Sequence, residues 1–248
     1  MIIDSHTHVD LVEAWGWMDP PELMLELMDE AGVDQAVVMT YRDAFGPDDP
    51  ATEYIRSAVE KYPQQLIGYV RINPNAPGAM DALDQAMSDY KMKGLKLHPV
   101  SYVGFPYKEA TLRLMRRAAQ YHAPVLFHTG DEALALPDEV AEAARRVPEA
   151  TVIMAHLGGY YHYNAVLDIA DKLPNVYVDT SAIPYPWVIM QAVEAFGAER
   201  VLYASDGPGC PPILEIEKVR LAGLSPAEQE LVFAGNIQRL LSEVRHVV

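Results

Sequence analysis

Residues 1–8 read MIIDSHTH, and this stretch introduces the pattern that decides the fold: a short apolar run that ends in polar side chains. Similar runs rich in Val, Ile, Leu and Met follow along the chain. Near-continuous apolar runs are typical of parallel strands that helices cover. The pattern predicts strands at residues 1–8, 33–40, 66–73, 94–98, 124–129, 151–157, 176–181 and 201–206.

Amphipathic segments separate these runs, and some carry helix-start signals such as Asp19-Pro20-Pro21. Strands that alternate with helices in this way predict a closed parallel (β/α)8 barrel, the TIM barrel, within an α/β class. Residues 225–245 add one or two C-terminal helices, and no Gly- or Ser-rich linker divides the chain, so we expect a single domain over residues 1–248. An open doubly wound sheet is the structural competitor, but the chain has no glycine-rich nucleotide motif. The predicted helices lie near residues 20–31, 50–61, 77–90, 107–121, 137–147, 162–172, 184–196 and 212–221.

Composition excludes several classes of function. The 248 residues include 19 Lys and Arg against 35 Asp and Glu, a net charge of −16 that disfavours binding to nucleic acid. The lone cysteine excludes a disulfide framework and a cysteine-rich zinc module. We see neither a secretory leader nor an apolar stretch near the roughly 20 residues that span a bilayer. We therefore expect a cytoplasmic protein with no membrane partner.

The end of the first run carries two histidines. His6 and His8 are two residues apart and share one face of a strand, because side chains alternate along a strand. The same alternation predicts that Asp4 lies on this face and that Ile3 points away from it. Two imidazoles on one face can bind one divalent metal ion.

Polar groups also end other predicted strands. His128 ends the fifth run, His156 follows the sixth and Asp206 ends the eighth. In the fourth run, alternation places Lys96 and His98 on one face, and such groups inside a barrel are costly unless they are paired or bound to metal. The carboxyl ends of barrel strands form the active-site rim, so these residues predict one site there.

Six motifs in order carry a resemblance over nearly the whole chain. The sequence resembles the amidohydrolase superfamily of metal-dependent barrels. More narrowly, it resembles the amidohydrolase-related family that includes aminocarboxymuconate-semialdehyde decarboxylase and related aromatic-acid decarboxylases. The motifs are Ile3-Asp4-Ser5-His6-Thr7-His8, Gly94-Leu95-Lys96-Leu97-His98-Pro99, His128-Thr129-Gly130, Ala155-His156-Leu157-Gly158-Gly159, Ser205-Asp206 and Gly235-Asn236-Ile237-Gln238-Arg239-Leu240-Leu241.

The resemblance implies a metal site and assigns roles to its residues. The implied metal ligands are His6, His8, His128 and Asp206. His156 would polarise the substrate or move a proton, while Asp206 would also handle protons. In binuclear relatives a lysine on the fourth strand is carbamylated, whereas in the family matched here Lys96 would be unmodified. We therefore expect one divalent metal ion, Zn²⁺ before Mn²⁺ or another ion, with a second metal less favoured.

The ligand types leave the reaction open. The main prediction is hydrolysis of a small carbonyl compound (an amide, lactone or ester) by metal-activated water. The first alternative is non-oxidative decarboxylation of an aromatic or unsaturated acid, and the second is a catalytically inactive barrel that binds metal or ligand. The expected partner is a small molecule; homo-oligomers are common among such barrels by resemblance, but no feature here sets the oligomeric state.

Substrate contacts can be predicted from the same rim. An apolar or aromatic pocket would form from loop aromatics, and a cationic side chain could pair with a substrate carboxylate. Structural roles compete: aromatic residues can fix loops, Lys96 and His98 can form a buried pair, and Asp206 can cap a helix. Asp179 is expected to face outward and receives no role. The candidate substrate-binding residues are Arg71, Lys96, His98, Trp17 and Tyr160.

Overall fold

Parallel strands form the wall of a barrel in the computed structural model, which describes residues 1–247. The eight-stranded sheet runs in the order β1-β4-β5-β6-β7-β8-β9-β10, and every ladder in it is parallel. The predicted TIM barrel is confirmed. The strands are β1 Ile3–His8, β4 Gln35–Met39, β5 Leu66–Arg71, β6 Gly94–Leu97, β7 Val125–Phe127, β8 Val152–Met154, β9 Val176–Asp179 and β10 Val201–Leu202.

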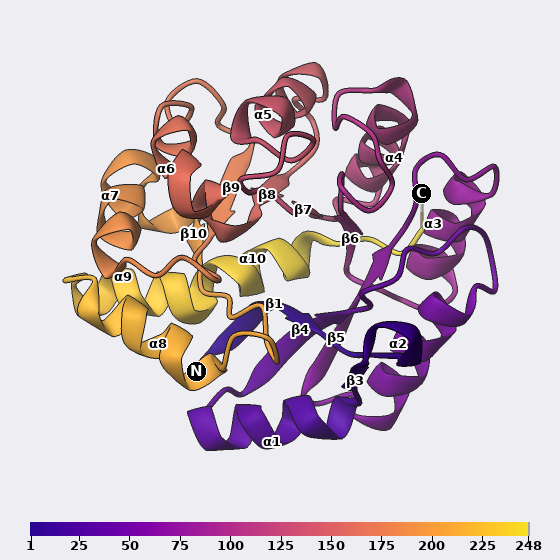
Figure 1. The fold of residues 1–248 in the computed structure, drawn as a ribbon, viewed down its shortest axis with the longest axis horizontal. Helices are drawn as coiled ribbons and strands as arrows, with labels where there is room; N and C mark the ends of the chain where they lie inside the picture. The colour runs from indigo at the N-terminus through magenta and orange to yellow at the C-terminus, as the bar shows by residue number, and fades with distance from the viewer. Residues whose placement is uncertain (248) are drawn as a thin grey trace.

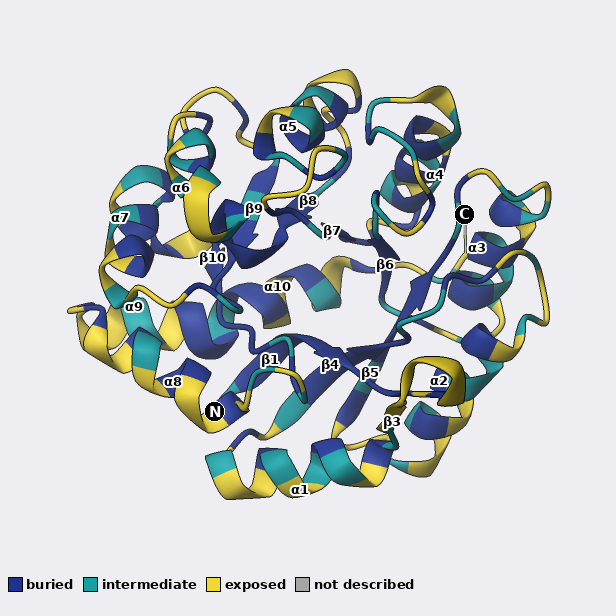
Figure 2. Cartoon of the chain, viewed as in Figure 1, coloured by how far each residue is buried: buried dark blue, intermediate teal, exposed yellow. Residues whose placement is uncertain are grey.

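Helices surround this wall, with buried faces toward the strands and exposed faces outward (Figures 1 and 2). Proline occupies the first turn of α1, α2, α5, α7 and α8, where its missing N–H costs nothing. The helix α6 begins three residues before the predicted one, directly after Gly158, whose φ is 82°. The helices are α1 Pro21–Ala31, α2 Pro50–Lys61, α3 Ala79–Ser88, α4 Glu109–Gln120, α5 Pro137–Arg146, α6 Gly159–Leu167, α7 Pro186–Phe196 and α8 Pro212–Leu221.

The segment just after β10 closes the barrel against β1. The Asp206 N–H donates to the His6 carbonyl at 2.8 Å, and the His8 N–H donates to the Gly207 carbonyl at 2.7 Å. The Ser5 N–H also donates to the Tyr203 carbonyl at 3.1 Å. These bonds join the first and last strands, so residues far apart in sequence meet at this seam.

The predicted alternation fails in the first half of β1. The register of β1 against β4 shifts between Asp4 and Thr7, so strict alternation does not hold along the strand. Ile3 packs in the inner cluster with Val37 and Tyr69, although the sequence pattern placed it on the opposite face from the histidines. The irregularity explains why the shared-face prediction for Asp4 and His6 was wrong.

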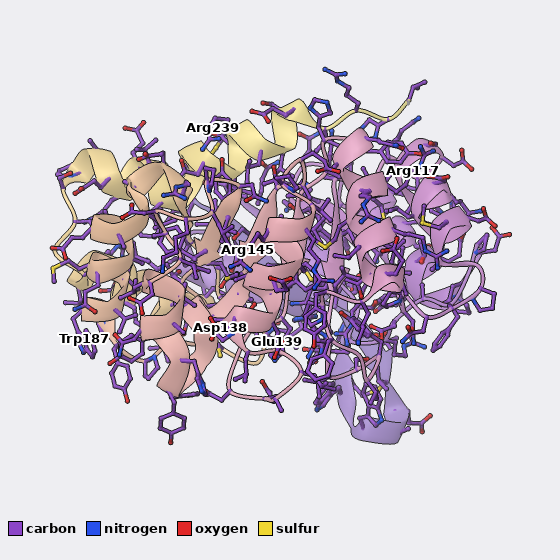
Figure 3. All side chains as sticks on the ribbon, turned by 90° about the horizontal axis from the view of Figure 1, so that it is seen from above. Arg117, Asp138, Glu139, Arg145, Trp187 and Arg239 are labelled. Carbon is purple, nitrogen blue, oxygen red and sulfur yellow. The ribbon has the colours of Figure 1, made fainter. Side chains whose placement is uncertain are left out.

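Two additions extend the barrel at opposite ends. The antiparallel hairpin of β2 (Asp10–Val12) and β3 (Trp17–Asp19) was not predicted and projects from the end that also holds Asp138, Glu139 and Trp187 (Figure 3). At the other end lie α9 (Pro226–Glu230), a π-helical turn (Leu231–Gly235) and α10 (Asn236–Glu243). Ile237 and Leu240 of α10 pack on the inner cluster and cover the amino-terminal end of the barrel.

No helix within residues 1–247 is both long enough and apolar enough to cross a bilayer.

Asn236 fastens the C-terminal helices to the barrel. Its buried Nδ2 donates to the Ala198 carbonyl at 2.7 Å and to the Val201 carbonyl at 2.9 Å. We expect Asn236→Ala to lower the free energy of unfolding by about 1–3 kcal/mol, because both buried carbonyls lose their donor. Urea unfolding measures this loss, with Gln238→Ala on the exposed face as the control. Equal effects of the two substitutions would contradict the assignment.

Candidate functional site

The seam between β1 and β10 brings a carboxylate against two imidazoles. The Oδ1 atom of Asp206 lies 3.3 Å from His6 Nε2 and 3.2 Å from His8 Nε2. The backbone bond from Asp206 to His6 sets this approach, and the φ of Asp206, 64°, directs its side chain back toward β1. The predicted convergence of these three side chains is therefore what the structure shows.

The hydrogen bonds of the two histidines leave no proton between them and Asp206. His6 Nδ1 lies 3.1 Å from Asp179 Oδ2, and His8 Nδ1 lies 3.3 Å from the Thr40 carbonyl oxygen. Both partners only accept hydrogen bonds, so each Nδ1 carries the proton and each Nε2 presents a lone pair. Two lone pairs and a carboxylate oxygen thus face one another, an arrangement that a cation satisfies.

Burial keeps both rings neutral. Burial, reinforced by the charge of Lys96, lowers the pKa of His6 to about 3. Burial also lowers the pKa of His8. Burial alone would raise the pKa of Asp206, but the neighbouring histidines, His6 first, hold it well below its usual value. A charged carboxylate beside two neutral imidazoles is the donor set that Zn²⁺ and similar divalent ions accept.

Lys96 is the cation nearest to these donors. Its Nζ donates to His6 Nε2 at 2.7 Å, and its side chain is almost fully buried. Burial lowers the pKa of Lys96 to about 7. In this structure the lysine therefore occupies the lone pair of His6 that a metal ion would use.

Two further imidazoles lie beside this group. His156 offers a donor atom within 4.8 Å of those of His6 and Asp206, so these three side chains could hold one metal ion. His128 lies beside His156, and its Nδ1 is 3.2 Å from His156 Nε2. The His128 ring stacks on His98 with centroids 4.0 Å apart and an interplanar angle of 4°. The structure thus places His156 closer to the predicted ligands than His128.

A cavity of about 920 Å³ opens above these side chains. Trp15 and Trp17 of the hairpin region form an aromatic wall with Tyr41, whose ring stacks on His8 at 4.7 Å. Imidazoles and cations occupy other parts of the lining. The polar residues that line the cavity include His8, Asp19, Arg71, Lys96, His98, Ser101, His128 and Asp206.

Arg71 presents the free end of its guanidinium to this cavity. Its Nε donates to Asp43 Oδ1 at 2.6 Å, and Asp43 is held in turn by the Ser101 hydroxyl at 2.7 Å. The terminal nitrogens of Arg71 have no hydrogen-bond partner within residues 1–247. An arginine fixed at one edge and open at the other is suited to bind an anionic oxygen pair.

One predicted substrate contact lies elsewhere. Tyr160 sits in the first turn of α6 with half of its surface exposed, and the cavity lining within residues 1–247 does not include it. Its backbone N–H donates to Asp131 at 2.9 Å, because the turn after β8 carries the tyrosine past the rim. Tyr160 therefore does not line this cavity, and its contact with substrate stays a prediction.

Sequence reasoning also missed Asp179, which faces inward and is fully buried. Val176 and Val178 pack in the outer cluster, while Tyr177 packs against the inner one, so alternation along β9 turns Asp179 inward. Its position at the end of an apolar run, like that of Asp206, was the available signal. Glu132 was missed as well; the hydrogen bond from His128 lowers its pKa to about 2.

Comparisons with known proteins agree with the barrel and its motifs. The family model described as Amidohydrolase matches residues 3–242. An uncharacterized TIM-barrel protein of Bordetella bronchiseptica is 20% identical, with a TM-score of 0.80 and 98% of each chain covered. A 2,6-dihydroxybenzoate decarboxylase from Rhizobium is 14% identical, with a TM-score of 0.76 over 97% of this chain and 98% of the other.

A further neighbour contains a metal ion. This dihydroxybenzoic acid decarboxylase from Polaromonas holds manganese and the inhibitor 2-nitroresorcinol. It is 16% identical, with a TM-score of 0.74 over 97% of this chain and 96% of the other. No functionally curated protein matches this chain.

The depressed pKa of Lys96 makes a prediction about stability. Between pH 7 and about pH 10.5 the unfolded lysine holds a proton that the folded one has lost, so stability rises with pH in this window. We expect the free energy of unfolding of the metal-free protein, relative to Lys96→Met, to rise by about 2 kcal/mol from pH 7 to pH 9. Urea unfolding at both pH values measures the difference, and a difference that is independent of pH would refute it.

Proposed function

Because this chain belongs to the amidohydrolase family, we propose that it is a divalent-metal-dependent enzyme that decarboxylates a planar, unsaturated carboxylic acid. The observation that carries the metal requirement is the approach of two acceptor atoms, His6 Nε2 and His8 Nε2, to the same carboxylate oxygen, Asp206 Oδ1. We propose that these residues hold the ion together with His128, and that Zn²⁺ or Mn²⁺ fills the site.

The metal ion, when bound, supplies Lewis acidity that draws electron density from a substrate oxygen. The chain's own residues orient the substrate. Arg71 holds an anionic oxygen group at the free end of its guanidinium. Trp17 and Tyr41, whose rings are tilted by 57° to each other, provide an apolar wall against which a conjugated ring or chain can lie.

In decarboxylation the bond between the substrate carbon and its carboxylate breaks, and carbon dioxide leaves. The electron pair stays on the carbon, and one proton must reach that atom to complete the product. Asp206 is the cavity-lining carboxylate that lies against His6 and His8, and 28% of its side chain is exposed. We propose that Asp206 takes this proton from solvent and delivers it to the carbon.

A hydrogen bond at His156 favours decarboxylation over the hydrolysis predicted first. For hydrolysis, His156 would have to donate a proton from Nε2 to the developing oxyanion. Instead Nδ1 faces the Ser181 hydroxyl at 2.8 Å, and that hydroxyl gives its only hydrogen to Asp179 Oδ1 at 2.6 Å. The proton of His156 therefore sits on Nδ1, and burial, which lowers the pKa of the ring, keeps it neutral.

Hydrolysis remains the second candidate on one specific observation. Asp206 lies against both Nε2 atoms and is open to the cavity, so it could accept the proton of an attacking water molecule. Both candidates use the same ligands, and product analysis separates them. An inactive metal- or ligand-binding barrel would bind the ion and turn over neither kind of compound.

Metal content tests the ligand assignment. We expect about one equivalent of Zn²⁺ or Mn²⁺ in the reconstituted protein, and loss of most of it in His6→Ala, His8→Ala and Asp206→Ala. His128→Ala should lose metal, whereas His156→Ala should keep it and lose turnover. Elemental analysis after gel filtration measures the metal content and a carbon dioxide release assay measures turnover, with the half-buried His162→Ala, outside the cavity lining, as the control. If His128→Ala keeps the metal and His156→Ala loses it, His156 is the metal ligand and His128 is not.

Product analysis tests the reaction. We expect carbon dioxide release from at least one hydroxybenzoate in a panel that includes 2,6-dihydroxybenzoate, and no cleavage of p-nitrophenyl acetate or simple lactones. Arg71→Gln should raise KM for the carboxylic acid about 10- to 100-fold, the loss expected for a charge-assisted hydrogen bond. Hydrolysis of the ester or lactone without carbon dioxide release would establish the second candidate instead.

A further inference from the structure

Asp179 connects two histidines that come from different strands. Its Oδ2 lies 3.1 Å from His6 Nδ1, and its Oδ1 accepts the backbone N–H of His156 at 2.9 Å. The same Oδ1 accepts the Ser181 hydroxyl at 2.6 Å and the Ser181 N–H at 3.1 Å. Asp179 is fully buried, so water does not compete for these hydrogen bonds.

The contact with His6 fixes one proton. Asp179 accepts hydrogen bonds from the His156 N–H, the Ser181 N–H and the Ser181 hydroxyl, so the group acts as a carboxylate that only accepts. His6 Nδ1 must therefore donate, which leaves the lone pair on Nε2. Lys96 Nζ reaches Nε2 at 2.7 Å, and in its protonated form, which only donates, it is compatible with this tautomer alone.

The contact with Ser181 fixes a second proton. The hydroxyl has one hydrogen, and the 2.6 Å contact gives it to Asp179 Oδ1. Toward His156 Nδ1, 2.8 Å away, the Ser181 oxygen can then only accept. The lone pair of His156 therefore lies on Nε2, which faces His128 Nδ1 at 3.2 Å.

The backbone around His156 also depends on Asp179. His156 has a φ of 60° and Leu157 a φ of 45°, both in the left-handed region that non-glycine residues rarely adopt. The His156 N–H is held by Asp179 Oδ1 within this turn. The Asp179 carboxylate thus stabilises the strained turn at His156 and, through Ser181, the orientation of the His156 ring.

We propose that Asp179 is the positioning residue of the site. It acts on His6 directly and on His156 through Ser181, and it directs the Nε2 lone pairs of both rings away from β9 toward the reacting groups. The inference rests on the proposed function for the use of these lone pairs. The tautomers themselves exist without metal or substrate and can be measured separately.

Nitrogen NMR of the metal-free protein labelled with ¹⁵N-histidine provides the first test. We expect both rings of the unsubstituted protein to carry the proton on Nδ1, with signals assigned through His6→Gln and His156→Gln. Ser181→Ala should release the tautomer of His156 and leave that of His6 unchanged. Asp179→Asn should release both. Glu215→Gln is the matched control, because this buried carboxylate contacts Lys218 and the Ala182 N–H but no histidine.

Metal affinity provides the second test. By calorimetric titration with Zn²⁺ or Mn²⁺, Asp179→Asn should weaken binding about 10- to 100-fold, the usual cost of removing a hydrogen-bond partner of a metal-bound histidine. Glu215→Gln should bind as the unsubstituted protein does. A merely structural role for Asp179 would lower the melting temperature but leave the His6 tautomer in place.

Two results would overturn the proposal: an unchanged His6 tautomer in folded Asp179→Asn, or an Nε2–H tautomer of His156 in the unsubstituted protein. If Asp179→Asn does not fold, Ser181→Ala decides, because retention of the His156 tautomer in that variant contradicts the relay. Correct tautomers without metal binding or turnover would reject the proposed function and leave the positioning role intact.

Discussion

The backbone hydrogen bond from Asp206 to His6 is the interaction on which both the barrel and its site depend. A parallel barrel must join its first and last strands, and here the join is made just beyond β10, at the carboxyl end of the wall. That position places the Asp206 side chain against His6 and His8. The same backbone contact therefore closes the barrel and brings the Asp206 carboxylate to the two histidines.

Burial then determines what the assembled groups can do. Neutral imidazoles are easier to bury than charged ones, and the lowered pKa values of His6 and His8 leave their Nε2 atoms unprotonated. The chain carries a net charge of −16, so an anionic substrate must be attracted locally. Arg71 supplies that positive charge at the cavity, and the metal ion would add to it. The net negative charge of the chain thus repels an anionic substrate at long range, whereas the positive charge at the cavity attracts it at short range.

Sequence periodicity predicted the barrel well because its signal repeats in every strand and helix. It also predicted the convergence of His6, His8 and Asp206, since carboxyl ends of parallel strands share one rim. It failed where one residue departs from regular alternation. The register shift in β1 reverses the phase at Asp4, and the short strand β9 gave too few residues to establish that Asp179 faces inward. Regular alternation also does not extend past β8, because the left-handed turn at His156 redirects the chain toward Tyr160.

The hairpin explains how so short a chain can shape a cavity. A barrel of this length has little sequence left for a lid. The loop between β1 and α1 itself folds into the two strands β2 and β3, whose Trp17 packs on Tyr41, which in turn stacks on His8. The aromatic wall is thereby tied to a proposed metal ligand. A substrate that lies against this wall is positioned beside the donor group. The contacts that select the substrate therefore also orient it for the reaction.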